Sequence, residues 1–143
     1  MITYGHENYI LQAIEGVLMQ KCDFEIELII ANDCSPDNTD LVVKDILANH
    51  PKKSRIKYFN HKKNLGMMPN FLFALDQCSG NYIAVCEGDD YWIDPLKLQR
   101  QVDFLEMNKE YTICWTKYLI KESENLSLLA EPDWVSQIEK IKM

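Results

Sequence analysis

The sequence has 143 residues, 47% of them hydrophobic and 26% charged, which suits one soluble domain with a real core. A formal net charge of −7 argues against a nucleic-acid or membrane-surface binder, because both partners are recognised by a basic face. A phosphorylated small molecule stays compatible with this charge, since a bound metal ion can supply the positive charge.

The five cysteines are odd in number and form no Cys-x-x-Cys pair, so neither a zinc knuckle nor a disulfide framework is expected. We expect reduced thiols in a cytoplasmic protein, with any membrane association made peripherally through partners. No stretch approaches the ~20 apolar residues of a transmembrane helix. The N-terminus lacks the pattern of a signal peptide.

Apolar periodicity divides most of the chain into alternating strands and helices. In chain order we expect a strand over residues 1–4, a helix over 9–19, a strand over 24–32, a helix from 36 to just before 51, a strand over 55–60, a helix from 68 to 78, a strand over 82–86, a helix from 94 to 107 and a strand over 111–118. The polar tail over 121–143 has at most a short helix from 132 to 140. The first strand starts so abruptly that we expect it to be cut short.

This alternation is typical of an α/β protein, in which a mostly parallel sheet carries helices on both faces. Ligands of such sheets bind outside the carboxyl ends of the strands. Three predicted strands end in polar clusters, which are Thr3 to Glu7, then Asn32-Asp33 with Asp37 and Asn38, then Glu87, Asp89 and Asp90. If the sheet is parallel, all three clusters lie on one edge.

The stretch over residues 82–92 is the most informative of the three. An apolar run leads directly into Glu87, Asp89 and Asp90. Carboxylates crowded at the end of a buried strand are costly unless a cation lies beside them. Carboxylate oxygens are the ligands of a hard divalent cation. The alternative is an ordinary acidic turn that caps the next helix.

Four segments resemble motifs of the family 2 glycosyltransferases, which use nucleotide-sugars and have the A-type (GT-A), Rossmann-like fold. The four segments are Met1-Ile2-Thr3-Tyr4-Gly5-His6-Glu7, Ile29-Ile30-Ala31-Asn32-Asp33-Cys34-Ser35-Pro36-Asp37-Asn38-Thr39, Asn64-Leu65-Gly66 and Glu87-Gly88-Asp89-Asp90-Tyr91-Trp92. Their order and spacing match the family over residues 1 to about 118.

The resemblance implies a nucleotide-sugar-binding domain over residues 1–120, with a UDP-sugar as the expected donor. Thr3 and Tyr4 would line the pocket for the base and ribose. Asp33 would accept a hydrogen bond from the imide N–H of a uracil-like base. The alternative for Asp33 is a turn acid that only shapes the loop.

The resemblance also implies roles for the acidic motif. Glu87 and Asp89 would hold the ribose and reach toward the metal, and Asp89 or Asp90 would bind Mg²⁺ or Mn²⁺ directly. A metal there would neutralise the departing diphosphate. The implied reaction passes the sugar, with inversion, to a hydroxyl of a sugar, a lipid-linked molecule or a protein.

Two positions depart from the family pattern: Gly5 stands where Asn is usual, and Glu87 stands where Asp is common. The acceptor half of the family, which supplies the catalytic base, has no recognisable counterpart, so no base is assigned. One alternative is therefore a truncated donor-binding module without independent turnover. Another, a sugar-nucleotide nucleotidyltransferase, is disfavoured because the sequence has no Gly-rich basic phosphate loop.

Overall fold

The computed structural model describes residues 1–122 and 125–128 of the chain. These residues belong to two compact units, Met1–Gln99 and Arg100–Met143, which are described separately. No helix in the described part of the chain is both long enough and apolar enough to cross a bilayer.

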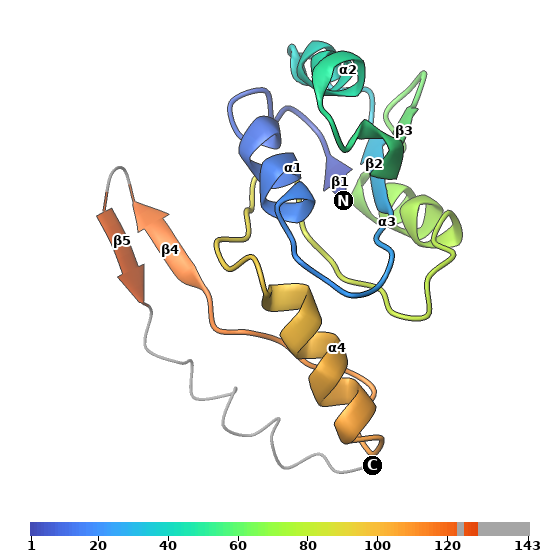
Figure 1. The fold of residues 1–143 in the computed structure, drawn as a ribbon. Helices are drawn as coiled ribbons and strands as arrows, with labels where there is room; N and C mark the ends of the chain where they lie inside the picture. The colour runs from blue at the N-terminus through green and yellow to red at the C-terminus, as the bar shows by residue number, and fades with distance from the viewer. Residues whose placement is uncertain (123–124, 129–143) are drawn as a thin grey trace. The chain divides into compact units, whose positions relative to one another are not determined.

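The first unit is built on a three-stranded sheet in the order β1-β2-β3 (Figure 1). The strands are β1 (Ile2–Thr3), β2 (Leu28–Asn32) and β3 (Ile56–Asn60). Both pairs are parallel, so that Thr3 lies opposite Asn32, and Asn32 lies opposite Asn60. The carboxyl ends of all three strands therefore meet at one edge, as the sequence predicts.

Helices cover both faces of this sheet, which confirms the predicted α/β fold (Figure 1). The helices are α1 (Ile10–Leu18), α2 (Thr39–Asn49) and α3 (Met67–Asp76), with a short 3₁₀ turn, η1 (Lys53–Arg55), before β3. Side chains alternate across a strand. Leu28 and Ile30 therefore join the core under α1 and α2, while Ile29 and Ala31 join the core under α3.

The predicted strand over residues 82–86 is wrong, because the structure has no strand there. The segment runs beside β1, and the Gly88 N–H donates a hydrogen bond to the Ile2 carbonyl at 3.0 Å. Since β1 has only two residues, it offers too short a ladder to hold a strand of five. Ile83 and Val85 are 55% and 57% exposed, so the apolar run is not buried as a central strand would be.

Two helices begin later than the sequence predicts. The second begins at Thr39 rather than at 36, and α4 (Lys97–Met107) begins at Lys97 rather than at 94. In both places an aspartate side chain bonds a nearby backbone N–H instead: Asp37 accepts from Thr39, and Asp94 accepts from Leu96. Asx turns of this kind compete with the helix for the same donors.

The second unit contains the rest of α4 and an antiparallel hairpin of β4 (Leu119–Glu122) and β5 (Asn125–Leu128). The predicted strand over 111–118 is wrong, because these residues form no ladder and Trp115 is 52% exposed. Within this unit the rings of Phe104 and Tyr111 pack with centroids 5.6 Å apart. The short helix predicted over 132–140 lies outside the described residues.

Helix α1 fixes the segment that follows the acidic turn. A Cβ on Gly16 would lie 2.8 Å from the Trp92 amide nitrogen, so any other residue at position 16 would clash with the Trp92 backbone. One turn later, the buried Gln20 side chain donates to the Asp94 carbonyl at 2.8 Å and accepts from the Leu98 N–H at 3.1 Å. Residues 92–98 are therefore tied to α1 by backbone contacts.

Replacing Gly16 with Ala is expected to lower the free energy of unfolding by about 1–2 kcal/mol. Overpacking against Trp92 backbone atoms exceeds the gain in helix propensity of about 0.5–1 kcal/mol. Urea denaturation measures the change, with Gln12→Ala on the exposed face of α1 as the control. Equal or greater stability of the Gly16→Ala protein would contradict this close contact.

Candidate functional site

The loops after β1, β2 and β3 and the acidic turn 87–90 come together at the carboxyl edge of the sheet. The Asp33 N–H donates to the Thr3 carbonyl at 2.9 Å, and the His61 N–H donates to the Asn32 carbonyl at 2.9 Å. The Gly88 N–H reaches Ile2, at the start of β1. The three polar clusters predicted from the sequence therefore lie on one edge.

The loop after β1 is held by side chains of the loop after β2. The N–H groups of Gly5, His6 and Glu7 donate in turn to Ser35 Oγ at 3.0 Å, Thr39 Oγ1 at 2.9 Å and Asp37 Oδ2 at 3.0 Å. The Glu7 side chain also bonds the loop after β2, because its carboxylate accepts from the Asn38 N–H at 2.8 Å. These four bonds give the β1 loop one defined conformation.

Asp37 is the centre of this connection. Burial on its own raises the pKa of the Asp37 carboxyl, but hydrogen bonds from the Thr39 hydroxyl and from the amides of Glu7 and Thr39 outweigh burial and lower it. The charged carboxylate is therefore the form that the loops hold. Asp37 therefore fixes the geometry of the loops after β1 and β2.

Asp33 ties the loop after β3 to the same edge. Its side chain is 3% exposed, with Oδ1 accepting from the Leu65 N–H at 2.7 Å and Oδ2 accepting from the Gly66 N–H at 2.9 Å. Asn64 adds a bond from its amide to the Asp33 carbonyl at 3.2 Å. Each carboxylate oxygen keeps a second lone pair, so the group can still accept one more donor.

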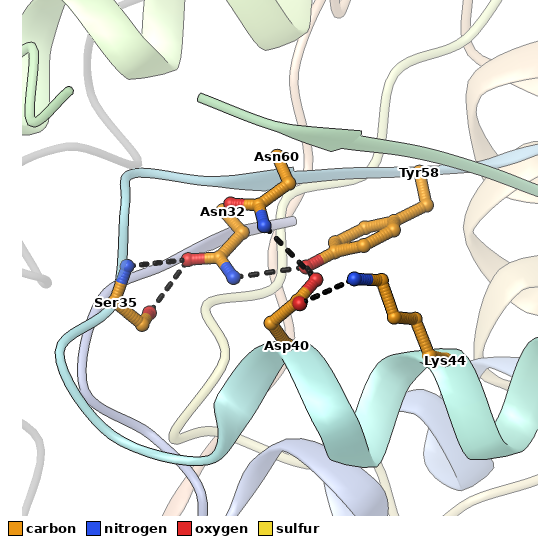
Figure 2. Close-up of polar contacts among 6 residues, drawn as sticks. All are labelled: Asn32, Ser35, Asp40, Lys44, Tyr58 and Asn60. Atoms are coloured by element: carbon orange, nitrogen blue, oxygen red, sulfur yellow. Dashed lines mark hydrogen bonds and ion pairs between the residues drawn. The ribbon is translucent and has the colours of Figure 1, made fainter. Parts of the chain in front are cut away.

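Asn32, at the end of β2, organises a polar network that sequence reasoning missed (Figure 2). Its Nδ2 donates to the Tyr58 hydroxyl at 2.9 Å, and that hydroxyl donates to Asp40 Oδ1 at 2.8 Å. Its Oδ1 accepts from the Ser35 hydroxyl at 2.6 Å. Because Ser35 in turn bonds Gly5, the network connects β2, β3 and α2 to the loop after β1.

The network requires a donor at position 32. Tyr58 has one hydroxyl proton, and Asp40 receives it. Burial, together with the Asp40 charge, raises the pKa of Tyr58, so the phenol stays a donor at neutral pH. An amide at position 32 can donate to the phenol oxygen, whereas a carboxylate cannot.

Asn32→Asp is therefore expected to lower the free energy of unfolding by about 1–3 kcal/mol, the cost of leaving buried acceptors facing each other. The double variant Asn32→Asp with Asp40→Asn should recover part of this loss, because Tyr58 can then donate to position 32. Urea denaturation of the wild type, both single variants and the double variant forms the cycle. Additive losses would contradict the proposed sharing of one proton.

Cys34 lies between Asp33 and Ser35 with a φ of 61°, in the left-handed region, and its side chain is exposed. This region costs a residue with a Cβ about 1–2 kcal/mol, which exceeds the extra entropy that glycine loses on folding. Cys34→Gly is expected to raise the thermal midpoint slightly, and Cys34→Val to lower it. A melting series of the three proteins measures both, and a less stable glycine variant would contradict the strain.

The two residues predicted to line the nucleoside pocket differ in accessibility. Tyr4 is 50% exposed, so its ring is open to a ligand. Thr3 is 2% exposed, with its side chain against Gly88. Thr3 therefore lies beneath the surface on which Tyr4 is displayed.

The acidic turn presents Glu87, Asp89 and Asp90 to solvent, while Gly88 is buried. Beneath it, the Cys86 thiol donates to the carbonyl oxygens of Asp90 at 3.5 Å and Glu87 at 3.6 Å. Burial, with the nearby Asp90 charge, raises the pKa of Cys86 to about 11. The thiol is thus protonated at neutral pH and supports the turn rather than ligating a metal.

The carboxylates of this turn fit a divalent cation that arrives with phosphate oxygens. Within residues 1–122 and 125–128, neither Glu87 nor Asp90 has an ion-pair partner, and the partner of Asp89 is His6. No group of three or more His, Cys, Asp or Glu side chains in those ranges surrounds a common point. Mg²⁺ is commonly held by one or two carboxylates plus substrate phosphates, so a third protein ligand is not required.

Sequence reasoning also missed His6, Gly16 and Gln20. His6 is separated from the acidic turn by about eighty residues of sequence, although its Nε2 lies 3.7 Å from Asp89 Oδ2. Gly16 carried a readable signal, because a glycine in the middle of an apolar helix often marks close packing. For Gln20 the signal was weaker, a polar residue directly after the apolar stripe.

The parallel sheet, the helices on both of its faces and the polar loops at its carboxyl edge define a Rossmann-like α/β domain. The family model described as Glycosyl transferase family 2 matches residues 1–141. The chain therefore belongs to glycosyl transferase family 2.

Solved structures share its fold. S. aureus TarS 1–349 in complex with UDP superposes with a TM-score of 0.63 at 26% identity, over 76% of this chain and 31% of that one. The mannosyltransferase PcManGT from Pyrobaculum calidifontis, solved with GDP-Man and Mn²⁺, gives a TM-score of 0.65 at 20% identity, over 73% and 30%. Both confirm the predicted GT-A-like fold.

Among curated proteins, Rv1520 of Mycobacterium tuberculosis is 40% identical over 114 residues, which are 80% of this chain and 32% of Rv1520. The chain thus spans about a third of the length of this relative.

Proposed function

We propose that the protein is a glycosyltransferase that passes a sugar from a nucleoside diphosphate sugar, with UDP as the nucleotide, to a hydroxyl acceptor. The observation that carries this proposal is the meeting of Tyr4, Asp33 and the acidic turn at one edge of the sheet. Membership of glycosyl transferase family 2 and the likeness to UDP-bound TarS support it.

In this proposal, the loops after β1 and β2 bind the nucleoside. The exposed Tyr4 ring offers a surface for the base and ribose, with Thr3 as the floor beneath it. Asp33 offers its remaining lone pairs to the imide N–H of uracil. A carboxylate that accepts from an imide discriminates against bases without that donor, because an unmet buried acceptor costs about 1–3 kcal/mol.

The acidic turn binds the diphosphate side of the donor. Asp89 and Asp90 would hold the divalent cation, and Glu87 would reach the ribose. Bound there, Mg²⁺ or Mn²⁺ supplies positive charge to the departing nucleoside diphosphate. The fold neighbour PcManGT was solved with Mn²⁺. Anchoring of residues 92–98 to α1 keeps the two aspartates in place.

Inverting transfer also needs a base that deprotonates the acceptor hydroxyl. No described residue is assigned this role. A second candidate function is therefore a donor-binding module without turnover of its own. The chain spans about a third of the length of Rv1520, which supports the donor-binding module as a second candidate.

Calorimetric titration of the chain with UDP, UDP-glucose, UDP-GlcNAc and GDP-mannose, each with Mn²⁺ and with EDTA, tests the proposal. UDP compounds should bind, and Mn²⁺ should tighten binding by about tenfold or more, which corresponds to ~1.4 kcal/mol. Hydrolysis or transfer of the bound sugar favours the enzyme, and binding without turnover favours the module. If no nucleotide binds, both candidates fail.

A further inference from the structure

The acidic turn covers two buried polar atoms that have no hydrogen-bond partner. Among the described residues, the buried side-chain nitrogen and oxygen atoms left without one are Thr3 Oγ1 and His6 Nδ1. A Cβ on Gly88 would lie 2.6 Å from the first and 2.8 Å from the second, so the Gly88 backbone lies against both atoms. Buried polar groups are nearly always paired, and an unpaired one is costly. The closed arrangement of the turn over β1 therefore leaves two polar groups unsatisfied.

Few bonds hold the turn in this closed arrangement. Within residues 1–122 and 125–128, the hydrogen bond that joins residues 83–90 to the rest of the protein runs from the Gly88 N–H to the Ile2 carbonyl. The side chains of Ile83 and Val85 are exposed, so they add little buried apolar contact. Segments with few buried contacts and few protected backbone bonds are the ones that open locally.

The segment around the turn is anchored at both ends, which defines how it can move. At one end the Ser79 N–H and hydroxyl donate to Glu27 Oε1 at 2.6 Å and 2.8 Å. At the other end the Trp92 backbone packs against Gly16. Residues 80–91 can thus lift from β1 between two fixed points, and the anchor at Trp92 keeps the acidic side chains near the edge of the sheet.

We propose that the acidic turn opens from β1 when a nucleotide binds, and that opening exposes the Thr3 hydroxyl and His6 Nδ1 to the ribose hydroxyl groups of that nucleotide. A hydroxyl group both donates and accepts, so it can satisfy two such neighbouring atoms. Opening also makes Thr3 accessible, which is 2% exposed in the closed arrangement. The inference rests on the proposed function, because it names the part of the nucleotide that this edge binds.

Opening in the absence of ligand is tested by amide hydrogen exchange of the protein alone. The Gly88 N–H and the Asp33 N–H both donate to carbonyls of β1, at 3.0 Å and 2.9 Å, so they form a matched pair. After correction for intrinsic rates, Gly88 should exchange about tenfold faster or more, with little acceleration by dilute urea, as in a local opening. Equal protection of the two amides would overturn the inference.

Contact with the ribose is tested by titration with UDP, 2′-deoxy-UDP and 3′-deoxy-UDP, all in EDTA so that no metal takes part. The wild type should bind at least one deoxy compound about threefold more weakly or worse, since a hydroxyl contact is lost. Thr3→Val should remove this preference, and Thr116→Val, at an exposed threonine, should keep it. A preference that survives Thr3→Val would overturn the contact.

Gly88→Ala tests whether the open arrangement is the one that binds. The added Cβ has no room beside Thr3 Oγ1 when the turn is closed, so it should hold the turn open. The amide of residue 88 should lose protection while that of Asp33 keeps it. UDP should bind in EDTA as tightly as to the wild type or more tightly, because a larger fraction of the protein is competent to bind. Weaker binding by the folded variant would overturn the inference, and if the variant does not fold, the other two measurements still decide it.

The outcomes distinguish a failure of this inference from a failure of the proposed function. UDP binding with no preference over either deoxy compound would overturn the ribose contact and leave the proposed function in place. Slow exchange of Gly88 would do the same for the opening. If the wild type binds no nucleotide, the proposed function fails, and the ribose contact fails with it.

Discussion

The double variant Asp89→Asn with Asp90→Asn is expected to lose the metal-dependent part of nucleotide binding. Both carboxylates are exposed, and in the described ranges their one ion-pair partner is His6, so they are available to a cation. Neutral amides offer a divalent cation far weaker ligands than carboxylates do. Loss of a residue that only hydrogen-bonds a metal ligand typically lowers metal affinity 10–100-fold. Loss of both direct ligands should therefore weaken UDP binding in Mn²⁺ by about 100-fold or more.

Calorimetry with UDP and Mn²⁺ measures this loss, and the same titration in EDTA should show little difference from the wild type. Asp76→Asn, an exposed aspartate of α3, is the matched control. The single variants then show whether Asp89, Asp90 or both provide the ligand. A double variant that keeps its Mn²⁺-dependent affinity would reduce the acidic turn to a helix-capping feature.

Asp33→Asn is expected to lower the free energy of unfolding by about 2–3 kcal/mol. The two carboxylate oxygens accept from the Leu65 and Gly66 N–H groups inside a buried site. Asparagine keeps one acceptor and points an NH₂ group at the other N–H, which leaves donors facing each other. Bonds to a charged acceptor are worth about 1.5–3 kcal/mol, and unsatisfied buried groups add to the loss.

Urea denaturation measures the change, with the exposed Asp23→Asn as the control, for which a change within about 0.5 kcal/mol is expected. At a temperature where the Asp33→Asn protein is folded, it should also bind UDP more weakly. The carboxylate that accepts from the imide N–H of uracil has then been replaced by an amide. Normal stability would show that Asp33 does not hold the loop after β3. Normal stability with lost UDP binding would assign it to the ligand alone.

The sequence was sufficient to predict the fold because β2 and the helices follow simple periodicity. The run from Leu28 to Ala31 is buried on both faces, and α1 shows a clear apolar stripe. The same reasoning failed at residues 82–86, where apolar composition is not enough. A strand needs a partner of matching length, and β1 offers only Ile2–Thr3.

The candidate site was predictable in its location but not in its internal contacts. Strand ends in a parallel sheet meet at one edge, so the polar clusters could be placed together from their positions alone. Hydrogen bonds between loops, such as those from Asn32 to Tyr58 and from Asp33 to Gly66, leave no periodic trace in the sequence. The burial of Thr3 and the approach of His6 to Asp89 are likewise tertiary contacts.

Asn32 shows how the residue type at one position depends on its tertiary partners. The hydroxyl of the neighbouring Tyr58 already gives its proton to Asp40. An amide supplies the donor that this arrangement lacks. The identity of residue 32 is thus coupled to residues 40 and 58, which a motif search along the chain does not reveal.

The central claim, that the acidic turn binds a divalent cation beside the nucleoside loops, is tested most directly by paramagnetic broadening. Mn²⁺ is added to ¹⁵N-labelled protein with saturating UDP. Amide signals of Gly88, Asp89 and Asp90 should broaden first, followed by those of Gly5 and His6 in the adjoining loop. Unbroadened signals at residues 88–90, or broadening centred on another acidic surface, would contradict the account.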